Sequence, residues 1–518
     1  MVEPALKVAQ LWSPGIGGGA GRVRVAPHLR LIHYPPPMLL LALAILAQPE
    51  PTLHDLGIKI SHDYAAEFVA LAPRPAPEEA AWPRYFEAYQ QLGCLPEGVA
   101  DCPKPGDPGW PETREFISTR QEAIRAIHDA ARHPALGYPV ATVDDPIFEH
   151  SPCHSNKPPE PAPTDEPPQV LDLRFAYIGT LRALTRALHA DAMLALEQGD
   201  GQRLADDLEA MLSIARHCSE HPVEVADICS LAITGLTLNV LERVLREQPG
   251  LLPTHALKPL IDQLLSAPMQ GHARMRTTQT RYVVLDVLQR GWADDGKGDG
   301  RFTSRGVRVI DELGGSEPSS KPGMAALLLL GQPAGRRATL EEFDRIMSQP
   351  EWTAPFWELE RWPDVEPAER EAQRKWRVKF GLLGIIMLDL PKGLRSTIAI
   401  HQRRDAARAS LALELYRREH NGYPESLDVV APLLNNELPR DQFTGRTLPY
   451  RLIDGVPHLY SFGPDLDDDN ARHNKDAATI TNWHPPKARK DSSNPPPDGD
   501  WVLFTLKAPV TPASSAVP

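Results

Sequence analysis

An acidic stretch near the C-terminus offers the clearest pattern for chemistry in this sequence. Five aspartates fall between positions 465 and 476, at Asp465, Asp467, Asp468, Asp469 and Asp476. Clustered carboxylates repel one another unless a cation joins them, and Ca²⁺ prefers about six to eight oxygen ligands. The alternation of Asp465, Asp467 and Asp469 therefore predicts a calcium site. The alternative is a solvated acidic hairpin tip, since runs of charge usually lie on the surface.

Two other clusters contain metal-binding side chains at less specific spacing. His217 and His221 lie four residues apart, but a proline follows at once, so the pair falls at a helix end, where histidines also interact favourably with the helix dipole. His150 and His154 flank Cys153 in a proline-rich stretch. The motifs HExxH, GxSxG and Walker A do not occur. The sequence therefore assigns no catalytic residue, and the balance is against an enzyme.

The elements around the acidic stretch are expected to form a small α+β module. Hydrophobic spacing predicts a long helix over 396–420, and Asn421-Gly422 ends it because both residues tolerate the left-handed conformation of a helix cap. Three strands are expected after it, over 448–453, 458–462 and 501–506.

This module resembles the globular domain of the major pseudopilin of type II secretion, over about 400–506. The matching segments are LELYRREHNGYPESLD (413–428), LPRDQFTGRTLPYRL (438–452) and LYSFGPDLDDD (459–469). Gln442 stands where the family has proline. The family's processing site and long apolar assembly helix are not found ahead of the module, so the resemblance implies the domain and not fibre assembly.

The resemblance also implies a calcium ion, held by the first aspartate of the loop, a later aspartate and backbone carbonyls. The first aspartate maps onto Asp465. The later one maps onto Asp500 if Gly499-Asp500-Trp501 is aligned, whereas Thr479 takes that place under the other alignment. The predicted ligands are therefore Asp465, Asp467, Asp469 and Asp500.

The region ahead of the module is predicted to be mainly helical. Apolar residues recur at helical spacing over 111–132, 171–198, 203–217, 223–246, 257–265 and 275–288. Residues 223–246 are apolar almost all round, which is typical of a central helix. The predicted fold class is mainly α, an irregular multi-helix domain followed by the small α+β module. A regular helical-repeat scaffold is the alternative architecture.

The predicted organisation has four parts. They are an N-terminal extension with a signal peptide (1–47), a helical domain with long proline-rich loops (48–391), the pseudopilin-like module (392–506) and a disordered tail (507–518). The 54 prolines fall largely between or outside the predicted helices, so they indicate long loops rather than a proline-rich recognition protein.

The run MLLLALAILA at 38–47 bears on the compartment. Its ten residues are too few for a membrane helix, which needs about 20, but fit the apolar core of a secretory signal. Small residues at Ala42 and Ala44 suit cleavage after Ala44, and Ala47 is a second possible cleavage position. We therefore predict export to the periplasm, the cell envelope or the medium. If the run is instead a buried segment of the fold, the protein is cytoplasmic.

Composition narrows the classes of function. The formal net charge of -13 argues against nucleic-acid binding through a global basic field. A mean hydropathy of -0.33 excludes a polytopic membrane protein, and no integral span is expected in the mature chain. The whole chain resembles large bacterial exported proteins of uncharacterised activity. We expect a structural or binding role with a protein partner at the cell envelope. The alternative is a hydrolase with its site in the helical domain.

Overall fold

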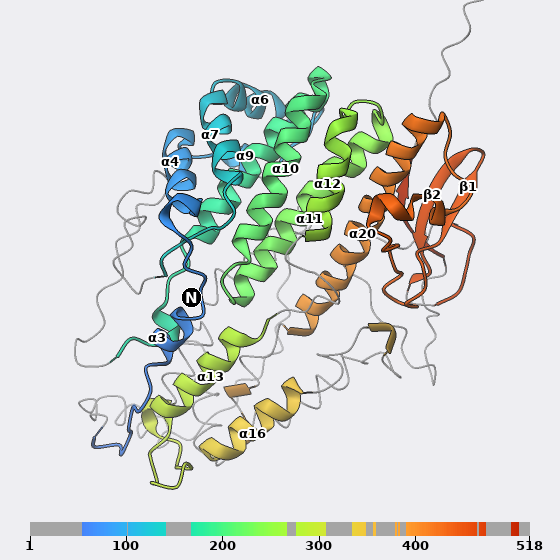
Figure 1. Ribbon diagram of the computed structural model, residues 1–518. Helices are drawn as coiled ribbons and strands as arrows, with labels where there is room; N and C mark the ends of the chain where they lie inside the picture. The colour runs from blue at the N-terminus through green and yellow to red at the C-terminus, as the bar shows by residue number, and fades with distance from the viewer. Residues whose placement is uncertain are drawn as a thin grey trace, which may run out of the picture.

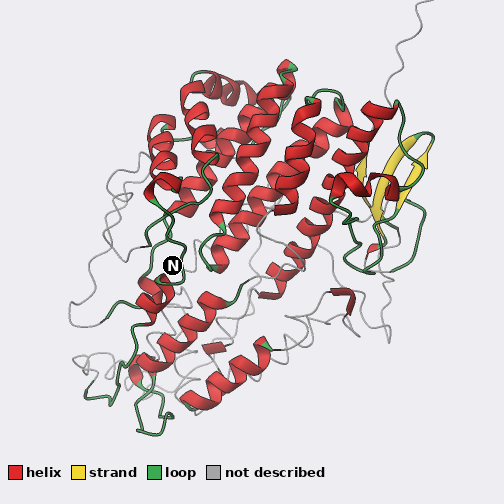
Figure 2. Ribbon diagram, in the orientation of Figure 1, coloured by secondary structure: helices red, strands yellow, loops and turns green. Residues whose placement is uncertain are grey.

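The computed structural model describes residues 54–100, 102–140, 167–266, 276–306, 334–348, 356–358, 379–380, 382–383, 390–463, 466–472 and 499–506. Within these ranges the chain is mainly helical, with one three-stranded antiparallel sheet near the C-terminus (Figure 2). The predicted fold class, mainly α with a small α+β end, is confirmed. Several predicted features lie outside these ranges, namely the 38–47 run, His150, Cys153, His154, Asp465 and Thr479.

Five long helices pack side by side and form the centre of the protein (Figure 1). They are α9 (Tyr177–Gln198), α10 (Gly201–Cys218), α11 (Glu224–Glu247), α12 (Thr254–Ser266) and α20 (Leu390–His420). Helix α10 packs against α9, α11 and α12, and α20 packs against α11 and α12. The tight turn from α9 to α10 uses Gly199 at φ 72° and Asp200, whose side chain accepts from the backbone N–H of Arg203 at 3.1 Å.

Helix α11 is strongly apolar and lies among the other helices. It contacts α9, α10 and α20, and buried side chains face all three. Among the described residues it is the one helix long and apolar enough to cross a membrane, with a mean hydropathy of 1.5 over a window that is 72% buried inside the protein. A core helix that is covered on several sides can have the same length and apolar composition as a membrane helix, because burial inside a protein also favours apolar side chains.

Shorter helices cover the α9–α10 side. They are α4 (Trp82–Leu92), α5 (Glu97–Ala100), α6 (Trp110–Ser118) and α7 (Gln121–Ala131). The 3-10 turn η1 (Pro77–Glu79) precedes α4, and α3 (Tyr64–Val69) and the 3-10 turn η2 (Val170–Asp172) pack against α13 (Thr278–Gly291). The single helix predicted over 111–132 is wrong, because α6 and α7 are separate. The Thr119 hydroxyl bonds back to the Phe116 carbonyl at 2.9 Å, and Arg120 Nε donates to the Leu92 carbonyl at 2.9 Å.

Two further helices lie below the central row in Figure 1, α13 (Thr278–Gly291) and α16 (Arg336–Met347). Helix α13 packs against α3 and α16. A short 3-10 turn, η3, covers Phe356–Glu358.

The sheet contains β1 (Tyr450–Ile453), β2 (Val456–Ser461) and β3 (Trp501–Thr505), in the order β1-β2-β3. Strands β1 and β2 form a hairpin with Ile453 opposite Val456. Its two turn residues, Asp454 and Gly455, have φ of 51° and 77°, as tight hairpin turns require. The 3-10 segment η4 (Leu427–Leu434) precedes the sheet and packs on α20.

Helix α20 forms a wall that the helical region and the sheet share. One side packs on α11 and α12, and the other packs on η4, β2 and β3. Because both sides are covered, its charged residues need partners within the protein. Glu414 is fully buried and pairs with Arg417 at 2.6 Å and Arg418 at 2.7 Å. One hydrophobic cluster runs from Tyr64 to Leu506, and the division into domains at 391/392 stays a prediction.

Candidate calcium site in the C-terminal module

A buried aspartate fixes the turn that leads into the acidic loop. Asp441 Oδ1 accepts from the backbone N–H groups of Phe443 and Thr444, both at 2.8 Å, and its Oδ2 accepts from Phe462 N–H at 3.0 Å. Burial raises the pKa of Asp441, and these hydrogen bonds oppose the increase. From α20, Gln402 Oε1 accepts from Gln442 N–H at 2.7 Å. The turn therefore connects α20 to the end of β2, where the loop begins.

Within the loop, Asp468 is used for local structure. Its Oδ1 accepts from Asn470 N–H at 2.9 Å and from the Tyr460 hydroxyl at 3.1 Å, and its Oδ2 lies 3.4 Å from an Arg451 nitrogen. Both Asp467 and Asp468 are exposed. These contacts close the loop back onto β1 and β2.

Asp469 and Asp500 lie together on the inner side of this loop. Asp500 is fully buried at the start of β3, and its Oδ2 accepts from Ala471 N–H at 2.7 Å. The backbone N–H of Asp500 donates to the Arg472 carbonyl at 2.9 Å, and Asp469 Oδ1 pairs with Arg472. The other oxygen of each carboxylate, Asp469 Oδ2 and Asp500 Oδ1, is buried and has no hydrogen-bond partner in the described structure.

The electrostatics of Asp500 follow from this geometry. Burial, the largest cause, and the negative charges of Asp468 and Asp469 raise the pKa of Asp500 to about 6. The backbone N–H of Ala471 and, more weakly, that of Asp469 oppose the increase. Buried carboxylate oxygens without a donor are costly, so this arrangement favours a proton or a cation between them.

The four predicted ligands differ in where the structure places them. It brings Asp469 and Asp500 together, leaves Asp467 exposed, and does not describe Asp465. No cluster of three or more His, Cys, Asp or Glu side chains suited to a metal ion occurs among the described residues. The two orphan oxygens nevertheless fit a hard cation, because they are buried, lack donors and belong to carboxylates near enough for Asp469 to raise the pKa of Asp500.

The histidine pair that the sequence analysis considered has separate structural partners. His217 is fully buried, and its Nδ1 and Nε2 lie 2.9 Å from the Tyr85 hydroxyl and the His133 carbonyl, respectively. Burial and Arg216 lower the pKa of His217 to about 3. His221 Nε2 lies 3.2 Å from the Tyr138 carbonyl, and burial lowers its pKa to about 4. Both imidazoles therefore stabilise the fold in their neutral form.

Comparisons with family models, with curated proteins and with solved structures found no significant match. The fold and the site define a mainly α protein with a small terminal sheet and a buried aspartate pair. The likeness to the pseudopilin domain therefore rests on the sequence motifs.

Proposed function

We propose that this chain is an exported or cell-envelope protein with a structural or binding role, and that calcium stabilises its C-terminal module. The observation that carries the proposal is the pair of buried oxygens, Asp469 Oδ2 and Asp500 Oδ1, which have no hydrogen-bond donor in the described structure. A divalent cation between them removes the repulsion between the two carboxylates and compensates for their lost solvation.

The residues around the pair would hold the ion as follows. Asp469 and Asp500 supply the carboxylates, and the resemblance adds Asp465 and backbone carbonyls. Ala471 N–H orients the Asp500 carboxylate, and Arg472 orients that of Asp469. When bound, calcium supplies positive charge and rigid oxygen coordination, which would order the loop between β2 and β3 for a protein partner.

The proposed export and the proposed calcium site are consistent with each other. Calcium sites in extracellular modules commonly have dissociation constants of about 10⁻⁴–10⁻³ M, which suits the calcium levels outside the cytosol. A site with few protein carboxylates belongs to this weak class, because affinity follows ligand charge and rigidity.

Thermal unfolding with calcium and with chelator tests the calcium proposal. We expect 5 mM calcium to raise the midpoint by about 2 °C over chelator, since binding to the folded state adds about 2 kcal/mol at saturating ligand. Asp500→Asn is expected to abolish the shift. The matched control Asp454→Asn changes an exposed hairpin aspartate and should keep it. No shift in the native protein, or an equal shift in Asp500→Asn, would overturn the proposal.

N-terminal sequencing tests export separately. Protein made in a Gram-negative host with a secretion pathway should begin after Ala44 or Ala47 and should fractionate with the envelope or the medium. An intact residue 1 on cytoplasmic protein would contradict the compartment and leave the calcium measurement unaffected.

A further inference from the structure

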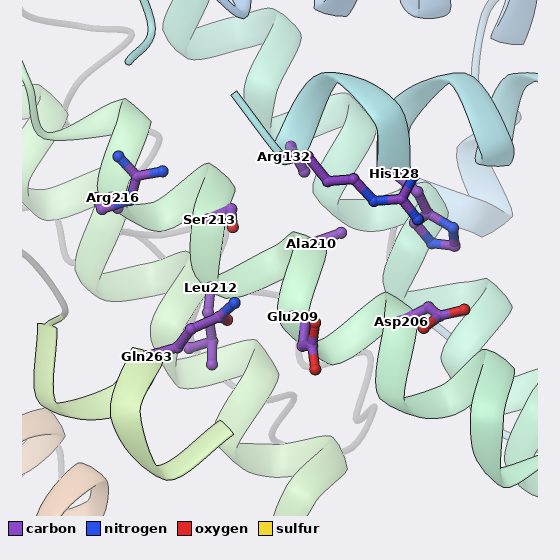
Figure 3. A pocket seen from close by; sticks show the side chains of 10 residues that line it. His128, Arg132, Asp206, Glu209, Ala210, Leu212, Ser213, Arg216 and Gln263 are labelled. Carbon is purple, nitrogen blue, oxygen red and sulfur yellow. The ribbon is translucent and has the colours of Figure 1, made fainter. Parts of the chain in front are cut away.

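A polar cavity of about 400 Å³ lies between α7, α10 and α12, in a part of the protein that the calcium proposal does not involve. Its charged and polar lining includes His128, Arg132, Asp206, Glu209, Ser213 and Arg216. The four from α10 recur at helical spacing, so one face of that helix forms the floor. Figure 3 shows His128 and Arg132 near Asp206 and Glu209, with Arg216 at the other end. The volume falls within the range of about 300–1,000 Å³ that is typical of small-molecule sites.

A buried network holds His128 in the cavity. Its Nε2 lies 2.8 Å from Asp207 Oδ1, and Asp207 is fully buried with no hydrogen bond to its Oδ2. Beneath it, Asp191 is also fully buried and is paired with Arg203, whose Nε donates to Asp191 Oδ2 at 2.7 Å. No described residue bonds to the second ring nitrogen of His128, Nδ1. The network fixes the ring and leaves that nitrogen for a ligand.

Protonation within the network follows from burial. Burial and the neighbouring Asp191 raise the pKa of Asp207 well above its usual range, and burial lowers the pKa of His128. Both changes favour the uncharged forms of the two side chains over the ion pair. The tautomer of His128 sets which ring nitrogen donates, so Nδ1 can take part in a hydrogen bond to a ligand as donor or as acceptor.

The two ends of the cavity have opposite charge. At one end lie the carboxylates of Asp206 and Glu209, together with Arg132, which pairs with Asp129. Burial, the largest cause, and Asp206 raise the pKa of Glu209, and the positive charges of Arg132 and His255 oppose the increase. At the other end, the Arg216 guanidinium donates to the carbonyls of Pro134 and His133 and lies 2.9 Å from His217 Nε2. It forms no ion pair within the described ranges, although its charge acts on Glu220 and opposes the raised pKa of that carboxyl. Glu209 and Arg216 are seven residues apart on α10, which places them about 10 Å apart along the helix axis.

We propose that this cavity binds a short unblocked peptide of about three residues, with its ammonium group at Glu209 and Asp206 and its carboxylate at Arg216. An extended chain spans about 3.3–3.6 Å per residue, so three residues match the separation of the charges. His128 Nδ1 and the Ser213 hydroxyl lie between the two ends and supply hydrogen bonds to the peptide backbone.

The geometry favours binding over hydrolysis. Ser213 and His128 both line the cavity, but no hydrogen bond joins them in the described structure, so they do not form a nucleophile–base pair there. Within the described ranges, no set of three metal-binding side chains is suited to activate a water either. The cavity therefore has charges for recognition without the groups for a cleavage step.

Isothermal titration of the full chain with Ala-Ala-Ala tests the proposal. We expect saturable binding, weakened about tenfold or more by N-acetylation of the peptide, by C-terminal amidation, or by Glu209→Gln in the protein. The matched control Glu87→Gln removes an exposed α4 carboxylate elsewhere and should bind like the native protein.

Each outcome of the titration either supports the peptide-binding proposal or overturns it. Binding that depends on both peptide charges and on Glu209 supports it. Absence of binding at 10 mM peptide overturns it, as does equal affinity for the acetylated peptide or for Glu209→Gln. Circular dichroism checks that Glu209→Gln is folded, which is expected because burial already raises the pKa of Glu209 and so disfavours its charged form.

Discussion

Two fully buried aspartates, Asp207 in the helical region and Asp500 in the C-terminal module, differ in what surrounds them. Asp207 faces His128 and a second aspartate whose charge Arg203 neutralises. Asp500 faces backbone N–H groups and Asp469, and the negative charges of Asp468 and Asp469 raise its pKa. The same problem, a buried carboxylate oxygen without a donor, therefore has two solutions. In the helical region, the raised pKa of Asp207 favours a proton on that side chain, and Arg203 neutralises the neighbouring aspartate. The C-terminal module instead keeps negative charge that a bound cation would balance.

The largest expected effect comes from removing the cation of the helical network. Arg203→Met leaves Asp191 fully buried without its ion pair, and we expect a loss of about 3 kcal/mol in the free energy of unfolding. Urea unfolding measures it. The control Arg246→Met breaks a pair whose arginine side chain is 52% exposed and should cost less than about 0.5 kcal/mol. Equal losses of unfolding free energy in the two variants would contradict the expected difference between a buried and an exposed ion pair.

The next effect concerns the turn that supports the acidic loop. Asp441→Ala removes the acceptor of three buried or half-buried backbone N–H groups, so we expect a loss of about 2 kcal/mol without calcium. Asp467→Ala alters an exposed aspartate in the same loop and should stay within about 0.5 kcal/mol of the native protein. Guanidinium unfolding in chelator compares them. A small effect of Asp441→Ala would show that the loop does not depend on this turn.

A smaller effect distinguishes the two buried aspartates directly. In chelator at pH 8, Asp500→Asn should stabilise the protein by about 1 kcal/mol, because it removes a buried charge that has no cation. Asp207→Asn should change stability by less than about 0.5 kcal/mol, since burial and Asp191 raise the pKa of Asp207 and so favour its uncharged form, which Asn resembles. Destabilisation by Asp500→Asn in chelator would mean that the native carboxylate has a partner, and the comparison would fail.

The pH dependence gives the most modest effect. The pKa of Asp500 is about 6 in the fold and 3.8 as its ordinary value, so the folded state holds more protons between them. Its contribution to stability is therefore fully present below about pH 4 and is lost as pH rises through about 6. The stability difference between native protein and Asp500→Asn, measured from pH 4 to 8 in chelator, should follow this course. Saturating calcium should flatten it, and a flat difference in chelator would contradict the raised pKa.

Local signals in the sequence predicted much of the fold. The Gly199-Asp200 turn and the apolar periodicity placed α9 and α10 within a few residues of their observed bounds, apart from a later start of α9. The Asp454-Gly455 turn lies between two strands that were expected one to two residues away from their observed bounds. The split between α6 and α7 was missed, because it depends on the contact of Arg120 with Leu92, 28 residues away.

The candidate sites also divide into residues that a local motif predicts and residues that only the packing of helices brings together. Asp469 and Asp500 were predicted from a motif and an alignment, and the structure places them together. The alternation that also selected Asp467 does not carry over to the loop, because Leu466 has φ of 67° and the backbone there is not an extended strand. His128 and Asp207 are 79 residues apart, and the sequence offers no spacing that relates them. Their pairing follows from the packing of α7 on α10.

The position of α20 between two layers has a consequence for how the protein loses its structure. Arg418 donates to the carbonyls of Leu252 and Pro249, and Glu414 holds Arg418 in place from within the helix. Detaching the sheet would expose one side of α20, and detaching α20 would expose α11 and α12. We therefore expect the two regions to unfold in one cooperative transition, so that a protease cut in one of them exposes the other to digestion as well.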